Sequence, residues 1–141
     1  MARVKRIKLE LDEEIEFPIL GISTALLDYR LVWELNKKMD LSFQKENNFF
    51  TLPNKKKELK SYEYYIHQNE DDLSKFFLVK NSQEGSTLFS DSERLDFFLV
   101  LRENYILSID DLIRDLRLIN GIVAVFSFSS NEFEFSEYLN D

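Results

Sequence analysis

The chain has little or none of several residue types on which common protein chemistry depends. Its 141 residues include no cysteine, one histidine, three glycines and two prolines. Without cysteine, disulfides, thiolate zinc sites and cysteine nucleophiles are excluded. Three separated glycines form no phosphate-cradling loop, and a single histidine does not suffice for a structural zinc site. We therefore expect no cofactor, no metal and no enzymatic activity.

Long apolar runs are also missing. No stretch approaches the ~20 residues that span a bilayer. The basic start, residues 1–8, is not followed by the apolar run of a signal peptide. These observations predict a cytoplasmic protein that makes no membrane contact.

The net charge of −8 repels nucleic acid unless basic residues cluster. One cluster exists, at Lys55, Lys56, Lys57 and Lys60. It is either a solvated loop or a phosphate-binding patch beside the tyrosines that follow it. The charge of the whole chain favours the loop, so we expect no nucleic-acid partner.

The C-terminal half contains a predicted strand–helix–strand unit. Residues 95–101 are apolar on both faces, which is typical of a central strand. From Ser108 to Asn120, isoleucine and leucine recur at helical spacing, with Ser108 as the N-cap and Gly121 as the stop. Residues 122–128 then predict a second strand, parallel to the first because the helix crosses over. Among the apolar residues of this helix, only Leu118 points away from the buried face.

An earlier helix is predicted to run from a cap at Ser23 or Thr24 to about Met39. Its polar stripe (Arg30, Glu34, Lys37 and Lys38) is narrow, so we expect the helix to be covered on most sides. Trp33 then belongs to the core, and its truncation to alanine would cost about 3–5 kcal/mol. Asp28 and Asn36 fall in the apolar arc. Either they hydrogen-bond neighbouring backbone, or they line a small pocket with Tyr29 and Trp33.

Other segments predict strands at residues 7–11, 41–45, 49–52, 62–67 and 76–80, and a loop at 81–85. Pro18 makes residues 17–22 an edge strand or a segment outside the sheet. Gly21 is expected to permit a tight turn before the first helix. The whole predicts a single α+β domain over residues 1–130, with five to six mostly antiparallel strands and two helices. An acidic C-terminal tail follows at residues 131–141.

Two blocks of the chain resemble the bacterial IPExxxVDY family. The opening block is Phe17-Pro18-Ile19-Leu20-Gly21-Ile22-Ser23, followed by Tyr29-Arg30-Leu31-x-Trp33-x-x-Asn36. The family's naming motif corresponds to residues 89–97, where Asp96 is identical and Phe89, Asp91, Leu95 and Phe97 are conservative replacements. Ser90 stands where the motif has proline, so this chain lacks the residue that makes the turn of the family rigid. The family has no established activity, so the resemblance implies a fold and a location but no mechanism.

The remaining polar residues provide few candidates for chemistry. His67 is expected to be an exposed residue at a strand end rather than a catalytic base. Carboxylates before and after the strand at 95–101 are separated by roughly 20 Å, too far for a paired site. Asp96 is either held by an ion pair or turn cap, or it binds a ligand. The candidate contacts with a ligand or partner are therefore Asp28, Tyr29, Trp33, Asn36 and Asp96.

Three functions stay open. A non-catalytic interaction or adaptor domain is favoured, because an acidic surface can meet a basic protein; the expected partner is another protein or a second copy. A small-molecule-binding regulatory domain is the alternative, by analogy with ACT-like folds. Such domains commonly dimerise, and exposed Leu118 is the candidate for that contact. An enzyme that uses carboxylates alone ranks last. A pocket shared by Asp28, Trp33, Asn36 and Asp96 would favour the regulatory domain, and scattered, internally bonded positions would favour the adaptor.

Overall fold

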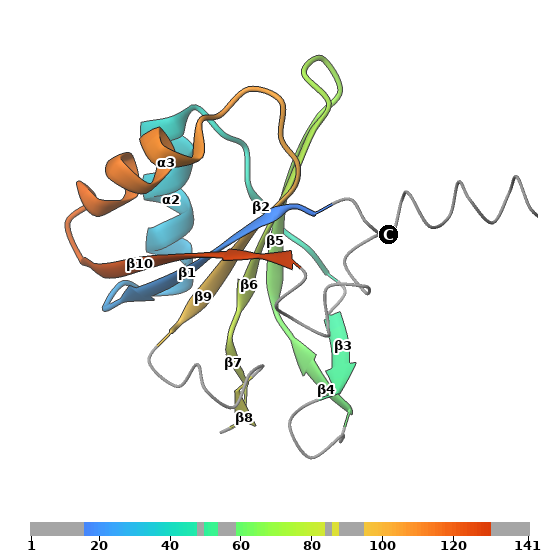
Figure 1. Cartoon of the computed structure of the whole chain (residues 1–141). Coiled ribbons are helices and arrows are strands. Elements are labelled where there is room, and N and C mark those ends of the chain that lie inside the picture. Colours follow the sequence, from blue (N-terminus) through green and yellow to red (C-terminus); the bar gives the residue numbers. More distant parts are fainter. Residues whose placement is uncertain (1–15, 48–49, 54–58, 84–85, 88–94, 131–141) are drawn as a thin grey trace, which may run out of the picture.

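The computed structural model describes residues 16–47, 50–53, 59–83, 86–87 and 95–130. Their main feature is a six-stranded sheet in the order β10-β1-β9-β6-β5-β2, in which every neighbouring pair is antiparallel. Two helices lie on one side of this sheet (Figure 1), so the α+β prediction is confirmed. The elements are β1 (Pro18–Thr24), α2 (Asp28–Met39), β2 (Gln44–Lys45), β5 (Tyr64–Asn69), β6 (Ser74–Lys80), β9 (Phe97–Glu103), α3 (Ile109–Arg117) and β10 (Ile122–Ser129).

Two short hairpins extend from the sheet on the side away from the helices (Figure 1). One pairs β3 (Phe50–Pro53) with β4 (Leu59–Tyr62), and the other pairs β7 (Ser82–Gln83) with β8 (Ser86–Thr87). β4 is absent from the sequence prediction, and β7 lies where a loop was expected. The predicted strand at 7–11, the lysines at 55–57, motif residues 89–94 and the tail at 131–141 lie outside the described residues.

The strand–helix–strand prediction is confirmed with one addition, because another strand lies inside the unit. β1 pairs with β9 on one side and with β10 on the other, antiparallel to both. β9 and β10 are therefore parallel to each other, with β1 between them. By the same reasoning β9 separates the parallel strands β1 and β6. The path β1-α2-β6-β9-α3-β10 is that of a ferredoxin-like β-α-β-β-α-β unit, to which β5 and β2 add two strands at one edge.

The prediction that residues 17–22 form an edge was wrong, because β1 is a central strand. Pro18 is the first residue of β1, where a missing N–H interrupts the ladder least. Gly21 lies inside the strand, paired with Phe98 and Phe126, and it forms no turn. A Cβ there would lie 2.7 Å from Leu95 Cδ1 and 3.0 Å from Phe128 Cε2. Gly21 thus allows these side chains to pack closely over β1.

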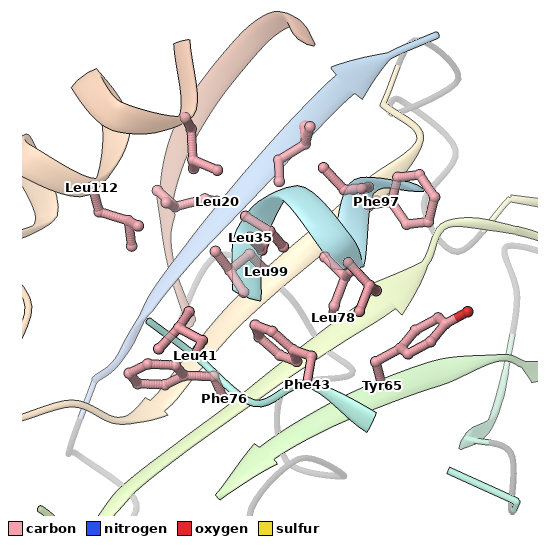
Figure 2. Close-up of a cluster of buried hydrophobic side chains, with 14 of the residues drawn as sticks. Leu20, Leu35, Leu41, Phe43, Tyr65, Phe76, Leu78, Phe97, Leu99 and Leu112 are labelled. Atoms are coloured by element: carbon pink, nitrogen blue, oxygen red, sulfur yellow. The ribbon is translucent and has the colours of Figure 1, made fainter. Parts of the chain in front are cut away.

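The larger buried cluster fills the space between the sheet and the helices (Figure 2). α2 contributes Leu31, Val32 and Leu35, and α3 contributes Leu112 and Leu116. Burying a side chain of this size stabilises the fold by about 1.5–3 kcal/mol. The strand residues of the cluster include Leu20, Ile22, Tyr65, Phe76, Leu78, Phe97, Leu99, Leu101 and Val125.

The opposite face of the sheet is buried as well. Phe98 and Val100 of β9 are fully buried there, and Tyr62 from the end of β4 packs in the same cluster. β9 is therefore covered on both faces, as its continuous apolar sequence predicted.

The helix ends follow local signals in one case and tertiary contacts in the other. Ser108 caps α3 by accepting a hydrogen bond from the Asp111 N–H at 3.5 Å, as predicted. Gly121 has a φ of +107° and ends the turn after α3. α2 begins at Asp28 rather than beside Ser23, because Thr24 is still part of β1 and its hydroxyl donates to the Gly121 carbonyl at 2.7 Å. Neither helix in the described part of the chain is long and apolar enough to cross a membrane.

Candidate functional site

The side of α2 that faces away from the sheet carries exposed aromatic and cationic side chains. Tyr29 is 66% exposed and Trp33 is 47% exposed. At 100° per residue they share an arc of about 100° with Arg30 and Lys37, opposite the buried residues of the helix. We refer to Tyr29, Arg30, Trp33 and Lys37 as the α2 outer surface. The prediction that Trp33 belongs to the core was wrong, because the sheet covers only one side of α2.

Trp33 is held in place by cations from the neighbouring turns of its own helix. The Arg30 Cζ atom and the Lys37 Nζ atom each lie 4.5 Å from the centroid of the Trp33 ring. Arg30 is itself oriented by an ion pair with Glu34 at 3.0 Å. An exposed cation–π contact contributes about 0.5–1 kcal/mol, so the two contacts favour one orientation of the ring although it faces solvent. The sequence prediction assigned both cations to a polar stripe and did not include this contact. Their spacing of three and four residues from Trp33 is the pattern that indicates it.

Asn36 serves the fold. Its Oδ1 accepts a hydrogen bond from the Phe43 N–H at 2.8 Å, and its Nδ2 donates to the Phe43 carbonyl at 3.2 Å. These two bonds fasten the segment that leads from α2 to β2. Of the two roles predicted for Asn36, the structure shows hydrogen bonding to neighbouring backbone.

Asp28 is bonded within the fold as well. Its carboxylate accepts from the Tyr29 N–H at 2.9 Å and from the Tyr65 hydroxyl at 3.0 Å. Burial of Tyr65, together with its hydrogen bond to Asp28, raises the pKa of Tyr65 to about 12. The hydroxyl therefore stays protonated at neutral pH and keeps α2 joined to β5.

Asp96 lies apart from the other candidates, just before β9. Its Oδ2 accepts a hydrogen bond from the Thr24 N–H at 2.8 Å. Its backbone N–H donates to the Ile22 carbonyl at 2.8 Å, and its carbonyl accepts from the Asn81 N–H at 3.0 Å. Asp96 thus provides hydrogen-bond partners for the backbone N–H of Thr24 and the carbonyl of Ile22 at the end of β1. Of the five residues predicted as contacts, Tyr29 and Trp33 are exposed together on α2. Asp96 is exposed elsewhere, before β9, where its carboxylate is bonded to Thr24.

His67 occupies a buried polar network, so the expectation of an exposed residue was wrong. The residue is 3% exposed, between the rings of Phe43 and Phe76. Its Nδ1 accepts from the Ser42 N–H at 2.9 Å, and its Nε2 lies 3.1 Å from Ser74 Oγ. Because Nδ1 is an acceptor, Nε2 must carry the proton of the neutral ring. Burial lowers the pKa of His67, and the nearby Asp72 opposes this shift.

The network contains serine, histidine and aspartate, but in the wrong order for a catalytic triad. The Ser74 hydroxyl donates to Asp72 Oδ1 at 2.5 Å, so its proton faces the carboxylate and not the imidazole. In a triad the carboxylate orients the histidine, and the histidine takes the serine proton. This arrangement can order a turn, and the imidazole donates to Ser74 Oγ instead of accepting its proton.

A shallow groove of about 390 Å³ runs between the start of β1 and the end of β10. Its lining includes one carboxylate, Glu16, and no second acid to pair with it. Within the described residues, no group of three or more histidine, aspartate or glutamate side chains could hold a metal ion. The groove therefore lacks the paired carboxylates that an enzyme of the type considered above would need. Its lining residues are Glu16, Phe17, Pro18, Ser127, Phe128 and Ser129.

Comparison of the chain with protein-family models, with curated proteins and with solved structures finds no match.

Proposed function

We propose that this chain is a non-catalytic protein-interaction domain, an adaptor, and that the α2 outer surface is where its partner binds. The observation that carries the proposal is Trp33, which is exposed and yet fixed by Arg30 and Lys37. Tryptophan, tyrosine and arginine are the residue types most enriched among interface residues that dominate binding energy. All three occur here within two turns of one helix. A side chain that is ordered before binding loses less conformational entropy in the complex.

The positions of the other candidates support the same function. Asp28, Asn36 and Asp96 are bonded within the fold and lie apart, which favours an adaptor over a small-molecule site. A small-molecule regulatory domain is the second candidate, on the strength of the ferredoxin-like path of the chain alone, and such an analogy supplies no site. Membership of the IPExxxVDY family and a cytoplasmic location belong to the proposal as well.

The test is photo-crosslinking in cells of the source organism. A photoreactive phenylalanine analogue replaces Tyr29, and the same analogue at Gln68, an exposed position in β5, serves as the control. We expect a discrete protein adduct from position 29 that is absent from position 68 and disappears when Trp33→Ala is added.

Native mass spectrometry of the purified chain separates the two candidates. A reproducible small added mass would favour the regulatory domain. A folded protein that forms no adduct at position 29 would rule out the α2 outer surface as the binding site.

A further inference from the structure

A second group of exposed apolar side chains lies at one end of the sheet. Leu73, in the β5–β6 turn, is 67% exposed, and Tyr105 and Ile106, in the β9–α3 loop, are 69% and 51% exposed. Lys75 pairs with Glu103 in the sheet, so the β5–β6 turn and the β9–α3 loop leave adjacent strands at the same end. Figure 1 shows both segments extending beyond the sheet on that side. We refer to Leu73, Tyr105 and Ile106 as the apolar tip.

The segments that carry the apolar tip are acidic. Residues 70–73 and 103–111 contain six carboxylates and no lysine or arginine. Some of these carboxylates are engaged locally: Arg102 lies 3.3 Å from Glu103, and Arg114 lies 3.1 Å from Asp111. Glu70 and Asp71, in the same turn as Leu73, and Asp110, four residues after Ile106, are exposed. The charge complementary to this surface is positive.

Leu73 is held in a backbone conformation that leucine rarely adopts. Its φ is +61°, in the left-handed region where a side chain with a Cβ costs roughly 1–2 kcal/mol relative to the right-handed region. Glycine or asparagine is the usual residue at such a position of a hairpin turn. Neither backbone preference nor burial favours leucine here, because the side chain is exposed. The fold thus presents an apolar side chain to solvent from a position where a small or polar residue would be more stable.

The buried network described above holds this turn. His67 Nε2 donates to Ser74 Oγ, the Ser74 hydroxyl donates to Asp72 Oδ1, and the Ser74 N–H donates to the same oxygen at 3.0 Å. At the start of the turn the Asp71 N–H donates to Asn69 Oδ1 at 2.8 Å. Residues on both sides of Leu73 are therefore held by hydrogen bonds, so the turn that carries Leu73 is braced from within the fold.

We propose that the apolar tip is a docking site for a basic amphipathic segment of a partner protein. Apolar side chains of the segment pack on Leu73, Tyr105 and Ile106, and its lysines or arginines face Glu70, Asp71 and Asp110. His67, Ser74 and Asp72 hold the turn that presents Leu73 through the hydrogen bonds given above. This surface is distinct from the α2 outer surface and goes beyond the proposed function; crosslinking at Tyr29 does not report on it.

The probe is a synthetic peptide of alternating lysine and leucine, titrated into the ¹⁵N-labelled full chain and followed by backbone NMR shifts. We expect the largest shifts at residues 70–74 and 103–107. Leu73→Asn should weaken binding about tenfold, as expected for loss of an interface anchor, while the melting temperature stays equal or rises. Leu118→Asn is the matched control, since Leu118 is 69% exposed, and it should leave binding unchanged.

Two further peptides test the chemistry of the site. Replacing lysine with glutamate, or leucine with serine, should abolish or strongly weaken binding. Equal binding by Leu73→Asn, or shifts spread evenly over every acidic surface of the protein, would overturn the proposal. If Leu73→Asn does not fold, Tyr105→Ser with Ile106→Ser tests the same surface, and unchanged affinity in that variant would overturn it as well.

Discussion

Two residues occupy environments opposite to those that their chemistry suggests. Trp33, the only tryptophan, lies at the surface under two cations, and His67, the only histidine, is buried between aromatic rings. In each case the neighbouring groups satisfy the side chain: cations on an indole face, and an N–H donor and a serine hydroxyl on an imidazole. Local contacts therefore stabilise each side chain in its environment. Substituting Trp33 or His67 measures what those contacts contribute.

Trp33→Ala should lower the free energy of unfolding by about 1 kcal/mol, the size of an exposed cation–π contact. Leu35→Ala, on the buried side of the same helix, should cost about 2–5 kcal/mol. Denaturant titration followed by circular dichroism measures both. Fluorescence of the native protein should also be quenched readily by acrylamide. A loss for Trp33→Ala as large as that for Leu35→Ala would place the indole in the core.

Protonation of His67 should destabilise the fold, because Nδ1 accepts the Ser42 N–H and a proton there would break that bond. Burial lowers the pKa of His67 in the folded state below the value of about 6.5 expected for the unfolded chain. The unfolded chain then binds the proton first as the pH falls. The stability that this pKa difference contributes is fully present above about pH 6.5 and is lost progressively as the pH falls toward the folded-state pKa.

The measurement is the melting temperature between about pH 8 and pH 5, the range that spans the histidine titration. The wild-type chain should lose stability below about pH 6.5 more steeply than His67→Gln, which cannot titrate. Carboxylates away from His67 contribute equally to both proteins. Parallel curves would show that His67 does not control the acid sensitivity.

At the scale of elements, two glycines allow close packing at the joints between strands and helices. Gly21 lets Leu95 and Phe128 pack over β1. Gly121 ends the α3 segment at a positive φ, and a Cβ there would lie 2.7 Å from both Cγ and Cδ2 of Leu26. The second site combines backbone strain with a steric clash, whereas the first involves a clash alone. Substitution should therefore affect the two sites unequally.

Gly121→Ala should destabilise the protein more than Gly21→Ala. The clash at Gly21 can be relieved in part by rotation of the end of Leu95, so we expect about 1 kcal/mol, at the low end for overpacking. Gly121→Ala adds roughly 1–2 kcal/mol of left-handed strain to its clash. Urea titration of the two variants gives the order, and Gly21→Ala with Leu95→Ala tests the clash by a double-mutant cycle. The reverse order would contradict the role assigned to the positive φ at Gly121.

At the scale of the whole molecule, stability should fall from the centre of the sheet toward the β2 edge. β1, β9 and β6 are adjacent strands whose side chains are buried on both faces. β2 has two exposed residues and, among the described strands, pairs with β5 alone. The two proposed binding surfaces lie outside this centre, so binding need not disturb the core.

Hydrogen exchange measured by mass spectrometry should reflect this gradient. Amides of β1 and β9 should exchange slowest, by global unfolding, and those of β2 fastest, by local opening. β10 should be intermediate, because it pairs with β1 on one side only in the described part of the chain. Protection of β2 equal to that of β9 would contradict the gradient.

Local patterns were sufficient to predict the elements near the C-terminus. Ser108, the spacing of the apolar residues after it and Gly121 defined α3, and the two-sided apolar run of β9 required a central strand. These elements can be predicted because hydrophobic periodicity, helix capping and a positive φ each depend on residues that are close together in the sequence. The same kind of reasoning failed at Pro18 and Trp33, where the result depends on which distant surface covers the segment.

The sequence by itself therefore determined the class of the fold, the presence of both helices, the start of α3 and the parallel relation of β9 and β10. Only the tertiary structure decided that β1 lies between them, that the aromatic side of α2 faces outward, and that His67 is buried beside Ser74 and Asp72. These outcomes follow from pairings between residues far apart in the chain. The free energy of such contacts depends on which surfaces meet. The hydrophobic periodicity within one segment does not specify which distant segment will cover it.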